Sequence, residues 1–562
     1  MKIKDMQYKR PDIQKFNSDM GEIIEKIKTS TSVDEILALR DKKLKLGREL
    51  TTASVLCSIR YTCNTADEFY VKEKDFWNEI SPEIQNIELN YGAALLNSPL
   101  RPQLEKALSD VYFRYLEIES KAMSETIIPD KIEENKLITD YTKLMSGLEY
   151  EFRGKKMSRP ELAGFFKSED RDTRREAYQV QGNVLNENKE QLDDIFDRLV
   201  KVRNGMASKM GCKDFVELGY YSMRRVSYGV EDISKFRKNV LLSITPVVSR
   251  LRTENAKRIG IDKFMFYDDG IVVKGGDPKP VGTKEDIFKA THAMYHAMGT
   301  ETGSFIDMML ENDAFDVDAR KNKCGGGYCK YIPNYKQPFI FANFNGSADD
   351  VDVMTHEAGH ALNAYLTGNN RFADEIGCGG METAETHSMS MEFFAWKYID
   401  NFFGKNSEKY KFMHALQNLS FIPYGTIVDY YQHIIYSQPN LTPAERCAVW
   451  KELESEYRPF ICFDGIPFIE DGRRWQYQSH IYGAPFYYID YCLAQTAAFG
   501  FLLKSLENYD DAFAKYMALS KQGGEKFWPQ LLSEAGITSP FEDGALSTLA
   551  SKVEKVIESL VC

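Results

Sequence analysis

Along most of the chain, apolar residues recur every three or four positions, with lysine, glutamate and glutamine between them. Residues 33–63 and 285–298 show the pattern clearly. This spacing is typical of an α-helix that buries one face. Clusters of proline and glycine near residues 98–103, 274–282 and 437–445 interrupt the periodic segments, as helix ends require. The pattern predicts a mainly α-helical protein.

One region departs from this helical spacing. Residues 325–350 are rich in glycine, tyrosine and phenylalanine, and residues 338–344 (PFIFANF) have the composition of a strand. We therefore expect a short hairpin or small sheet here. Ser347, with Asp350 three residues later, is typical of a helix start. The next helix should begin directly after the strand, an arrangement that positions side chains rigidly enough for an active site.

Length and charge limit the class of protein. With 562 residues the chain exceeds one ordinary core, so two or more domains or lobes are expected. The net charge of −12 would repel nucleic acid and anionic membranes, so neither is expected as a partner. No apolar run approaches the roughly 18 residues of a membrane helix, and the first residues do not resemble a secretory signal. Ten scattered cysteines do not resemble a disulfide framework. We expect a reduced, cytoplasmic protein.

The strongest chemical signal is the segment MTHEAGHALNAYL at residues 354–366. His356 and His360 are four apart and share one face of a helix, and Glu357 follows the first of them. A catalytic zinc takes three protein ligands and keeps one position for water. A glutamate placed between the two histidines can remove a proton from that water. We predict one zinc per chain, with His356 and His360 as ligands and Glu357 as general base.

Apolar residues also flank His356 and His360, so the helix should be largely buried, and buried histidines need partners. Two similar patterns elsewhere in the chain lack part of this signal. His292 and His296 have the same spacing, but no glutamate follows the first histidine, so we interpret this pair as structural. Cys324 and Cys329 have no second cysteine pair of matching spacing, and we interpret them as ordinary thiols.

The third ligand decides the class of zinc site. Position 366 is leucine, which excludes the class with a third histidine six residues after the second. Residues 379–398 predict a helix that starts after two glycines, and spacing favours a glutamate on this helix as the ligand. It leaves Glu382 and Glu385 as alternatives. The carboxylates downstream of the motif are Asp374, Glu375, Glu382, Glu385 and Glu392.

Four segments in the same order resemble one known family. They are THEAGHA, ETHSMSMEFFAW, residues 203–225 and residues 480–495. The chain resembles the oligoendopeptidase F and thimet oligopeptidase family of zinc peptidases, and is most similar to the oligoendopeptidase F or Pz-peptidase branch. The resemblance implies a two-lobed helical fold with a small sheet beside the active-site helix and a deep substrate channel. It further implies an N-terminal helical lobe at 1–200 and a catalytic zinc-peptidase domain at 201–562.

The resemblance also assigns the third ligand. In the family, this ligand is the glutamate that opens an E-x-x-S-like segment 25 residues after the second histidine, and Glu385 occupies that position here. Glu382 then becomes a flanking residue. Asp352 and Glu392 are candidate acceptors for the free nitrogen of a ligand imidazole.

Further site residues are implied by the family's use of the segment HIYGAPFYYIDY. A histidine and tyrosines of this segment bind substrate and stabilise the tetrahedral intermediate, and the best matches are His480, Tyr488 and Tyr491. Tyr482 and Tyr487 are near alternatives. Residues 325–344 resemble the strand at the edge of the family's cleft, where an extended peptide pairs with the backbone.

These features predict a zinc-dependent endopeptidase that hydrolyses short unstructured oligopeptides. Zinc and a tyrosine hydroxyl would hold the oxyanion, while Glu357 passes a proton to the leaving amine. A dipeptidyl carboxypeptidase or carboxypeptidase of related fold is the alternative enzyme, marked by a cation that grips the substrate C-terminus. A catalytically silent peptide-binding protein is a third reading, against which Glu357 argues. Side-chain preference and oligomeric state are left open.

Overall fold

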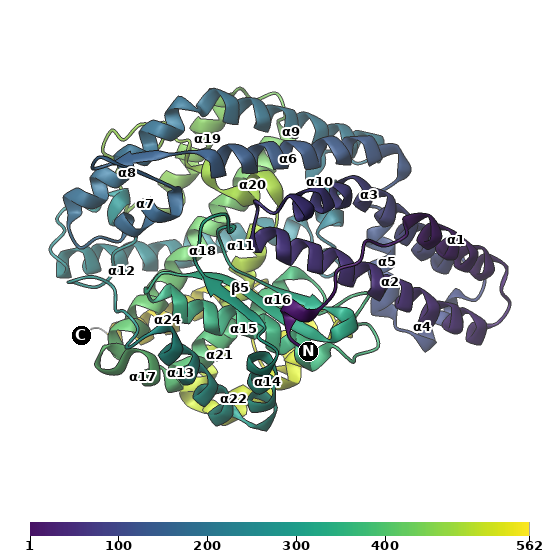
Figure 1. The fold of residues 1–562 in the computed structure, drawn as a ribbon. Coiled ribbons are helices and arrows are strands. Elements are labelled where there is room, and N and C mark those ends of the chain that lie inside the picture. The colour runs from purple at the N-terminus through teal and green to yellow at the C-terminus, as the bar shows by residue number, and fades with distance from the viewer. Residues whose placement is uncertain (561–562) are drawn as a thin grey trace.

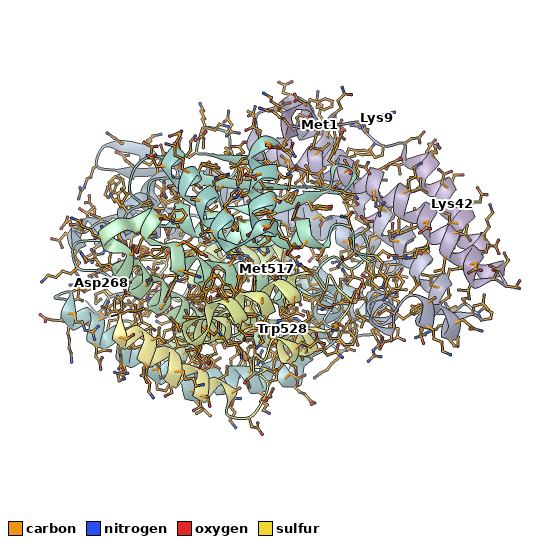
Figure 2. The ribbon with its side chains drawn as sticks, turned by 90° about the horizontal axis from the view of Figure 1, so that it is seen from below. Met1, Lys9, Lys42, Asp268, Met517 and Trp528 are labelled. Atoms are coloured by element: carbon orange, nitrogen blue, oxygen red, sulfur yellow. The ribbon has the colours of Figure 1, made fainter. Side chains whose placement is uncertain are left out.

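The computed structural model describes residues 1–560 and is mainly α-helical, as predicted. The first five helices project to one side of the molecule (Figure 1). Lys42, on the second of these helices, lies at one end of the molecule and Asp268 at the other (Figure 2). This projection has its own core, to which Phe372 and Ile376 of the later chain contribute. Its helices are α1 (Ile13–Thr29), α2 (Val33–Cys63), α3 (Glu68–Leu96), α4 (Arg101–Ala107) and α5 (Asp110–Glu119).

The middle of the chain adds a second group of helices and a small hairpin of β1 (Tyr150–Phe152) with β2 (Lys155–Met157). One continuous helix, α9, passes through residue 200, and the division of the chain at that residue stays a prediction. The helices are α6 (Ile128–Gly147), α7 (Arg159–Phe166), α8 (Arg171–Glu187), α9 (Lys189–Lys209), α10 (Phe215–Ser222), α11 (Val230–Asn239) and α12 (Thr245–Arg258).

The rest of the chain surrounds α15 and α16, which lie near the middle of the molecule (Figure 1). The predicted helix at 285–298 is α13. The helices are α13 (Lys284–Met298), α14 (Thr300–Glu311), α15 (Asp349–Thr367), α16 (Met381–Phe394), α17 (Asp400–Phe403), α18 (Ser407–Ser437), α19 (Pro443–Tyr457), α20 (Ser479–Gly483), α21 (Tyr488–Glu507), α22 (Tyr509–Ser520), α23 (Trp528–Glu534) and α24 (Ala545–Ser559).

The second sheet contains the predicted strand and hairpin. Its strands are β3 (Phe315–Asp318), β4 (Tyr328–Ile332) and β5 (Gln337–Phe344), in the order β3-β5-β4. The central strand β5 pairs parallel with β3 and antiparallel with β4. Within the described residues β4 is therefore an edge strand, and β5 leads into α15.

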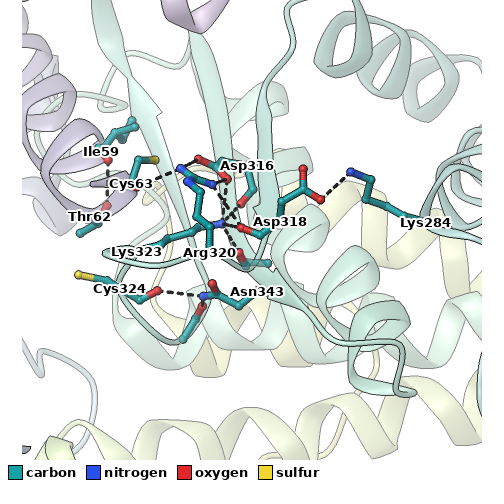
Figure 3. Close-up of polar contacts among 12 residues, drawn as sticks. Ile59, Thr62, Cys63, Lys284, Asp316, Asp318, Arg320, Lys323, Cys324 and Asn343 are labelled. Atoms are coloured by element: carbon teal, nitrogen blue, oxygen red, sulfur yellow. Dashed lines mark hydrogen bonds and ion pairs between the residues drawn. The ribbon is translucent and has the colours of Figure 1, made fainter. Parts of the chain in front are cut away.

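The loop between β3 and β4 is held by charged residues. Lys323 and Arg320 both point at Asp316 (Figure 3). The side chain of Lys323 is fully buried, and its Nζ also donates to the carbonyl of Ala342 on β5 at 2.5 Å. The backbone N–H of Cys324 donates to the carbonyl of Thr62, on α2, at 2.9 Å. The segment before β4 is thus attached both to the sheet and to the projecting helices.

Two further findings concern the described residues as a set. None of the helices within residues 1–560 is long and apolar enough to cross a membrane. The nine cysteines in this range are free, including Cys324 and Cys329. Cys562 lies outside the described residues.

Candidate active site

The helix that carries the HEAGH segment starts directly after β5. The carboxylate of Asp350 accepts hydrogen bonds from the backbone N–H groups of Asn345 and Gly346, at 2.9 and 2.8 Å. These bonds fix the turn that leads into α15, and the helix starts within two residues of Ser347, as predicted. Carboxylates in the first turn of α15 also interact favourably with the positive end of the helix dipole.

A close approach of two helices brings the third carboxylate to the histidines. A Cβ atom at Gly359 would lie only 2.7 Å from the Cα of Ser388 and 2.9 Å from the carbonyl oxygen of His387. The backbones of α15 and α16 therefore touch at Gly359, where only glycine fits without a shift. Glu385, one turn before Ser388 on α16, is thereby placed opposite His356 and His360.

The three side chains converge on one point. Glu385 Oε2 lies 3.4 Å from Nε2 of His356 and 3.4 Å from Nε2 of His360. A tetrahedral zinc with ligand bonds of about 2.0–2.1 Å holds its ligand atoms about 3.3 Å apart. Glu385 is 3% exposed, whereas the two imidazoles are 22% and 21% exposed. Two nitrogens and one oxygen with an accessible side fit a catalytic zinc site with one open position.

Glu392 orients one of these histidines. Nδ1 of His356 donates to Glu392 Oε1 at 2.6 Å, and His414 contacts the other oxygen at 2.8 Å. Burial opposes charge on Glu392, but the hydrogen bonds from the two histidines outweigh it and lower its pKa to about 2. Asp352, the other predicted acceptor, instead accepts a hydrogen bond from Tyr410. Burial raises the pKa of Asp352 to about 7.

Glu385 has two further partners. Its Oε1 accepts a hydrogen bond from the hydroxyl of Tyr487, and its Oε2 accepts one from Ser388 at 3.0 Å. Burial opposes its charge, but His360 and His356 hold the pKa of Glu385 well below its ordinary value. The carboxylate is thus ionised and fixed in orientation, as a metal ligand must be.

Glu357 is buried beside the histidines, under the glycine-rich segment. A Cβ atom at Gly327 would lie 3.4 Å from Glu357 Oε1 and 3.4 Å from the carbonyl of Phe341 on β5. Gly327 immediately precedes β4, so this edge strand starts next to the carboxylate. Burial raises the pKa of Glu357, although the neighbouring histidines oppose the shift.

The predicted histidine and tyrosines form one aromatic cluster. The ring centre of His480, on α20, lies 4.9 Å from that of Tyr488 and 6.0 Å from that of Tyr491. Gln478 Nε2 contacts His480 Nδ1 at 2.9 Å. Burial and then the charge of Glu385 raise the pKa of Tyr491, so its hydroxyl keeps its proton at neutral pH.

Of the two near alternatives, Tyr487 lies in this cluster and Tyr482 does not. The ring of Tyr487 is 4.9 Å from that of Tyr491. Tyr482 stacks on Tyr141 at 3.9 Å, and its hydroxyl donates to the carbonyl of Leu192. The four-residue spacing of Tyr487 and Tyr491 in the sequence is the signal that would have indicated their shared helix face.

Glu382 lies in a separate buried group. The hydroxyl of Tyr228 donates to Asp490 Oδ1 at 2.7 Å and is 3.4 Å from Glu382 Oε2, while Arg225 forms an ion pair with Asp490 at 3.2 Å. Burial raises the pKa of Glu382 to about 8. Among the two alternatives that spacing left open, Glu385 is therefore the glutamate that meets the histidines.

A mainly helical chain with this site has known relatives. The model of the peptidase M3 N-terminal domain matches residues 3–123, and that of peptidase family M3 matches residues 289–551. The structure of a Pz peptidase A with an inhibitor is 40% identical, with 99% of each chain covered and a TM-score of 0.96. The chain belongs to peptidase family M3.

Two further relatives fall in the same branch. A structure described as an oligoendopeptidase F from Bacillus anthracis str. Ames is 36% identical, with 100% of this chain and 98% of that one covered, and a TM-score of 0.90. Oligopeptidase PepF of Bacillus subtilis (strain 168) is 22% identical over 426 residues, and the match spans 72% of this chain but 60% of that protein. The predicted resemblance to the oligoendopeptidase F or Pz-peptidase branch is confirmed.

Proposed function

We propose that this chain is a zinc-dependent endopeptidase that hydrolyses short unstructured oligopeptides. The observation that carries the proposal is the convergence of His356, His360 and Glu385 next to Glu357. These three side chains would hold one zinc ion. When bound, zinc supplies Lewis-acid polarisation of the scissile carbonyl and lowers the pKa of water.

Glu357 is the general base in this proposal. Its carboxylate takes a proton from the attacking water and gives that proton to the leaving amine. Efficient proton transfer in both directions needs a pKa near the working pH. The burial that raises the pKa of Glu357 moves it in this direction.

The tyrosine cluster would stabilise developing negative charge on the substrate. Tyr491 and Tyr488 assist as neutral hydroxyl donors, and His480 contacts the bound peptide. Tyr487 has a different role, because its hydroxyl donates to Glu385. We assign it to holding this ligand carboxylate in place.

The edge of β4 is the proposed binding strand for the substrate backbone. A peptide added alongside β4 forms main-chain hydrogen bonds and passes the start of the strand, where Gly327 lies beside Glu357. The proposal includes a deep channel around this edge, an N-terminal lobe at 1–200, a catalytic domain at 201–562 and a cytoplasmic location.

The exopeptidase alternative requires a free cation beside the cleft. The two lysines that flank the glycine-rich segment are already engaged. Lys323 pairs with Asp316, and the Nζ of Lys330 donates to the hydroxyl of Ser58. Lys323 is neutralised by Asp316, whereas the partner of Lys330 is a hydroxyl, so Lys330 is the cation that the exopeptidase alternative would use.

The decisive experiment compares metal content and turnover in Glu357→Gln. If Glu357 is the base, the variant keeps one zinc per chain and loses activity by at least about 10²–10⁴-fold, the usual effect of a general acid–base group. Metal analysis and cleavage of a quenched fluorescent peptide measure the two quantities. Near-normal activity, or loss of the zinc, would refute the assignment of Glu357.

A pair of control variants tests the ligand set. Glu385→Ala should purify with little zinc and no activity, whereas Glu382→Ala should retain its zinc. The reverse pattern would show that Glu382 is the ligand. A silent peptide-binding protein would show no hydrolysis in the native chain with zinc bound.

A further inference from the structure

Helices α13 and α14 bring together a second group of two histidines and a carboxylate. Nε2 of His292 and Nε2 of His296 each lie 2.9 Å from the same oxygen, Oδ1 of Asp307. The histidines are four residues apart on α13, and the aspartate comes from the following helix, α14. The proposed zinc site has the same plan, with two histidines on α15 and a carboxylate on α16.

The second group has the chemistry of a metal site. All three ligand atoms lie within 4.8 Å of one another, as they do at His356, His360 and Glu385. A bound tetrahedral metal needs ligand atoms about 3.3 Å apart. An opening of about 0.4 Å from the present 2.9 Å would meet this need. Exposed side chains allow such a change by small rotations.

The packing of the two helices leaves room for the imidazole of His296. A Cβ atom at Gly303 would lie 2.9 Å from His296 Nδ1. The ring therefore occupies space that glycine leaves open on α14. From the sequence alone we interpreted this pair as structural, because no glutamate follows His292. Asp307 comes 11 residues after His296, beyond a turn between two helices. The structure supplies the missing carboxylate.

The two histidines of this group are more exposed to solvent than the other described histidines. His292, His296 and Asp307 have side chains that are 46%, 45% and 44% exposed. Among residues 1–560, His292 and His296 are the only exposed histidines. A metal ion from solvent can reach the group directly, and water can complete its coordination.

We propose that His292, His296 and Asp307 form a second binding site for a divalent transition metal such as Zn²⁺, Ni²⁺ or Cu²⁺. Imidazole with one carboxylate suits these ions rather than Mg²⁺ or Ca²⁺, which prefer oxygen ligands. The site binds metal more weakly than the buried group, by at least about 10–100-fold, because within residues 1–560 orienting hydrogen bonds are found at the buried ligands alone. Glu392 accepts a hydrogen bond from His356, and Ser388 and Tyr487 donate to Glu385.

A metal at this position would also strengthen the support of α15. It would join α13 to α14, and Phe305 of α14 packs against Tyr365 of α15 with ring centres 5.7 Å apart. Binding to the folded chain alone raises its thermal stability as free metal increases. The effect should be visible without any measurement of hydrolysis.

Zinc stoichiometry tests the proposal directly. Metal-stripped native chain, dialysed against increasing free Zn²⁺, should bind one ion tightly and a second more weakly. The variant His292→Ala/His296→Ala should keep the tight ion and peptidase activity but lose the weaker ion. Asp307→Asn should weaken the second step by about tenfold or more. Lys289→Ala, an exposed change on the same helix, should bind two ions.

Two further measurements make the outcome independent of the catalytic assignment. The variant His356→Ala/His360→Ala should lose the tight ion, keep the weaker one and still gain thermal stability from Zn²⁺. Untagged native chain should be retained on an immobilised Ni²⁺ resin, and His292→Ala/His296→Ala should pass through. Equal zinc uptake by native chain and that double variant would overturn the second site. Unchanged affinity in Asp307→Asn would overturn the three-ligand assignment.

Discussion

Four buried glutamates on α15 and α16 differ in what their neighbours do to them. Glu385 lies 3.4 Å from two histidines and Glu392 accepts hydrogen bonds from two, so both stay ionised. Histidines also lie near Glu357, but burial outweighs them and raises its pKa, which suits the proposed general base. Burial, and then the charge of Asp490, raise the pKa of Glu382 and oppose its ionisation. In the proposed function, the same residue type would thus serve as ligand, orienting group, base and buried acid.

The pH dependence of stability should reveal the buried acid. Glu382 has a pKa of about 8 in the folded chain against an ordinary value of 4.5, so the folded state holds a proton that the unfolded state releases above pH 4.5. The contribution of this site to stability is therefore full below pH 4.5 and falls as pH rises towards 8, by at most about 1.4 kcal/mol per pH unit. Glu382→Gln should remove this decrease in stability with rising pH.

The measurement is thermal unfolding of both chains at several pH values from 5 to 8. The melting temperature of Glu382→Gln relative to the native chain should rise with pH, and zinc content should stay unchanged. Asp490, whose pKa burial raises to about 6, stays in both chains and serves as an internal background. Parallel pH profiles would show that Glu382 is ionised in the folded state.

The tyrosines should separate into different kinetic classes. Tyr491→Phe removes a hydroxyl proposed to bind the oxyanion, so kcat should fall on the order of 10²–10³-fold with KM little changed. Tyr488→Phe should show a smaller loss, more of it in KM. Steady-state kinetics and melting temperatures measure these effects. If Tyr491→Phe keeps full kcat while Tyr488→Phe loses it, the two roles are exchanged.

Tyr487 should differ from both in its metal affinity. Its hydroxyl donates to Glu385 Oε1, so Tyr487→Phe removes an orienting hydrogen bond from a ligand. We expect zinc affinity to fall by about 10–100-fold, measured by competition with a chelator. Unchanged zinc affinity together with a large loss of kcat would instead make Tyr487 the oxyanion donor.

Some residues of the candidate site could be predicted from local spacing in the sequence, and others could not. His356, His360 and Glu357 follow from spacing on one helix, because their relation is local. Glu385 could not be separated from Glu382 by spacing, because the choice depends on where α16 crosses α15. The hydrogen bond of Tyr487 depends on how α21 meets α16, a contact between segments about 100 residues apart.

At the scale of elements, the contact of α15 with α16 depends on Gly359. A methyl group there would lie 2.7 Å from the Cα of Ser388, so the helices must separate. Gly359→Ala should destabilise the fold by about 1–3 kcal/mol, typical of overpacking. It should also lower zinc affinity, because Glu385 moves away from the histidines. Denaturant unfolding of the metal-free chain and zinc titration measure the two effects separately.

Gly47→Ala is the matched control for this substitution. Gly47 lies inside α2, and a Cβ atom there would meet nothing within 4 Å. The change should stabilise the chain by about 0.5–1 kcal/mol, because alanine has a higher helix propensity than glycine. Zinc affinity should not change. An equal gain from Gly359→Ala would mean that the two helices are not in contact there.

Elements with a regular pattern were predictable, and those fixed by distant contacts were not. Helical spacing indicated α2 and α13, and composition indicated β5 with its hairpin. The four-residue strand β3 has too short a pattern to stand out, and it exists because it pairs with β5. Lys323 likewise attaches the β3–β4 loop to the carbonyl of Ala342 on β5, a contact that the sequence alone does not indicate (Figure 3).

At the scale of the molecule, the projecting helices α1–α5 are connected to the rest of the chain at two places near the candidate site. Arg40 of α2 forms a buried ion pair with Glu375, in the segment between α15 and α16. The end of α2 also binds the loop that precedes β4 through Thr62 and Cys324. The N-terminal helices therefore help to hold both the segment between α15 and α16 and the proposed substrate strand.

Substrate form is the property of the whole molecule that tests the proposed function most broadly. The edge of β4 spans Tyr328–Ile332, so an extended peptide of at least about five residues is needed to pair with it and reach Glu357. A folded protein offers no free extended segment of this kind. We expect cleavage of unstructured peptides and of an unfolded protein, and no cleavage of the same protein when it is folded. Peptides with blocked ends should be cleaved as well as free ones, because an endopeptidase does not bind the charged end of its substrate. Mass spectrometry of the products from a mixed library of blocked and free peptides makes the comparison. Strict dependence on a free C-terminal carboxylate would favour the carboxypeptidase alternative, since it would require a cation that binds the end of the substrate.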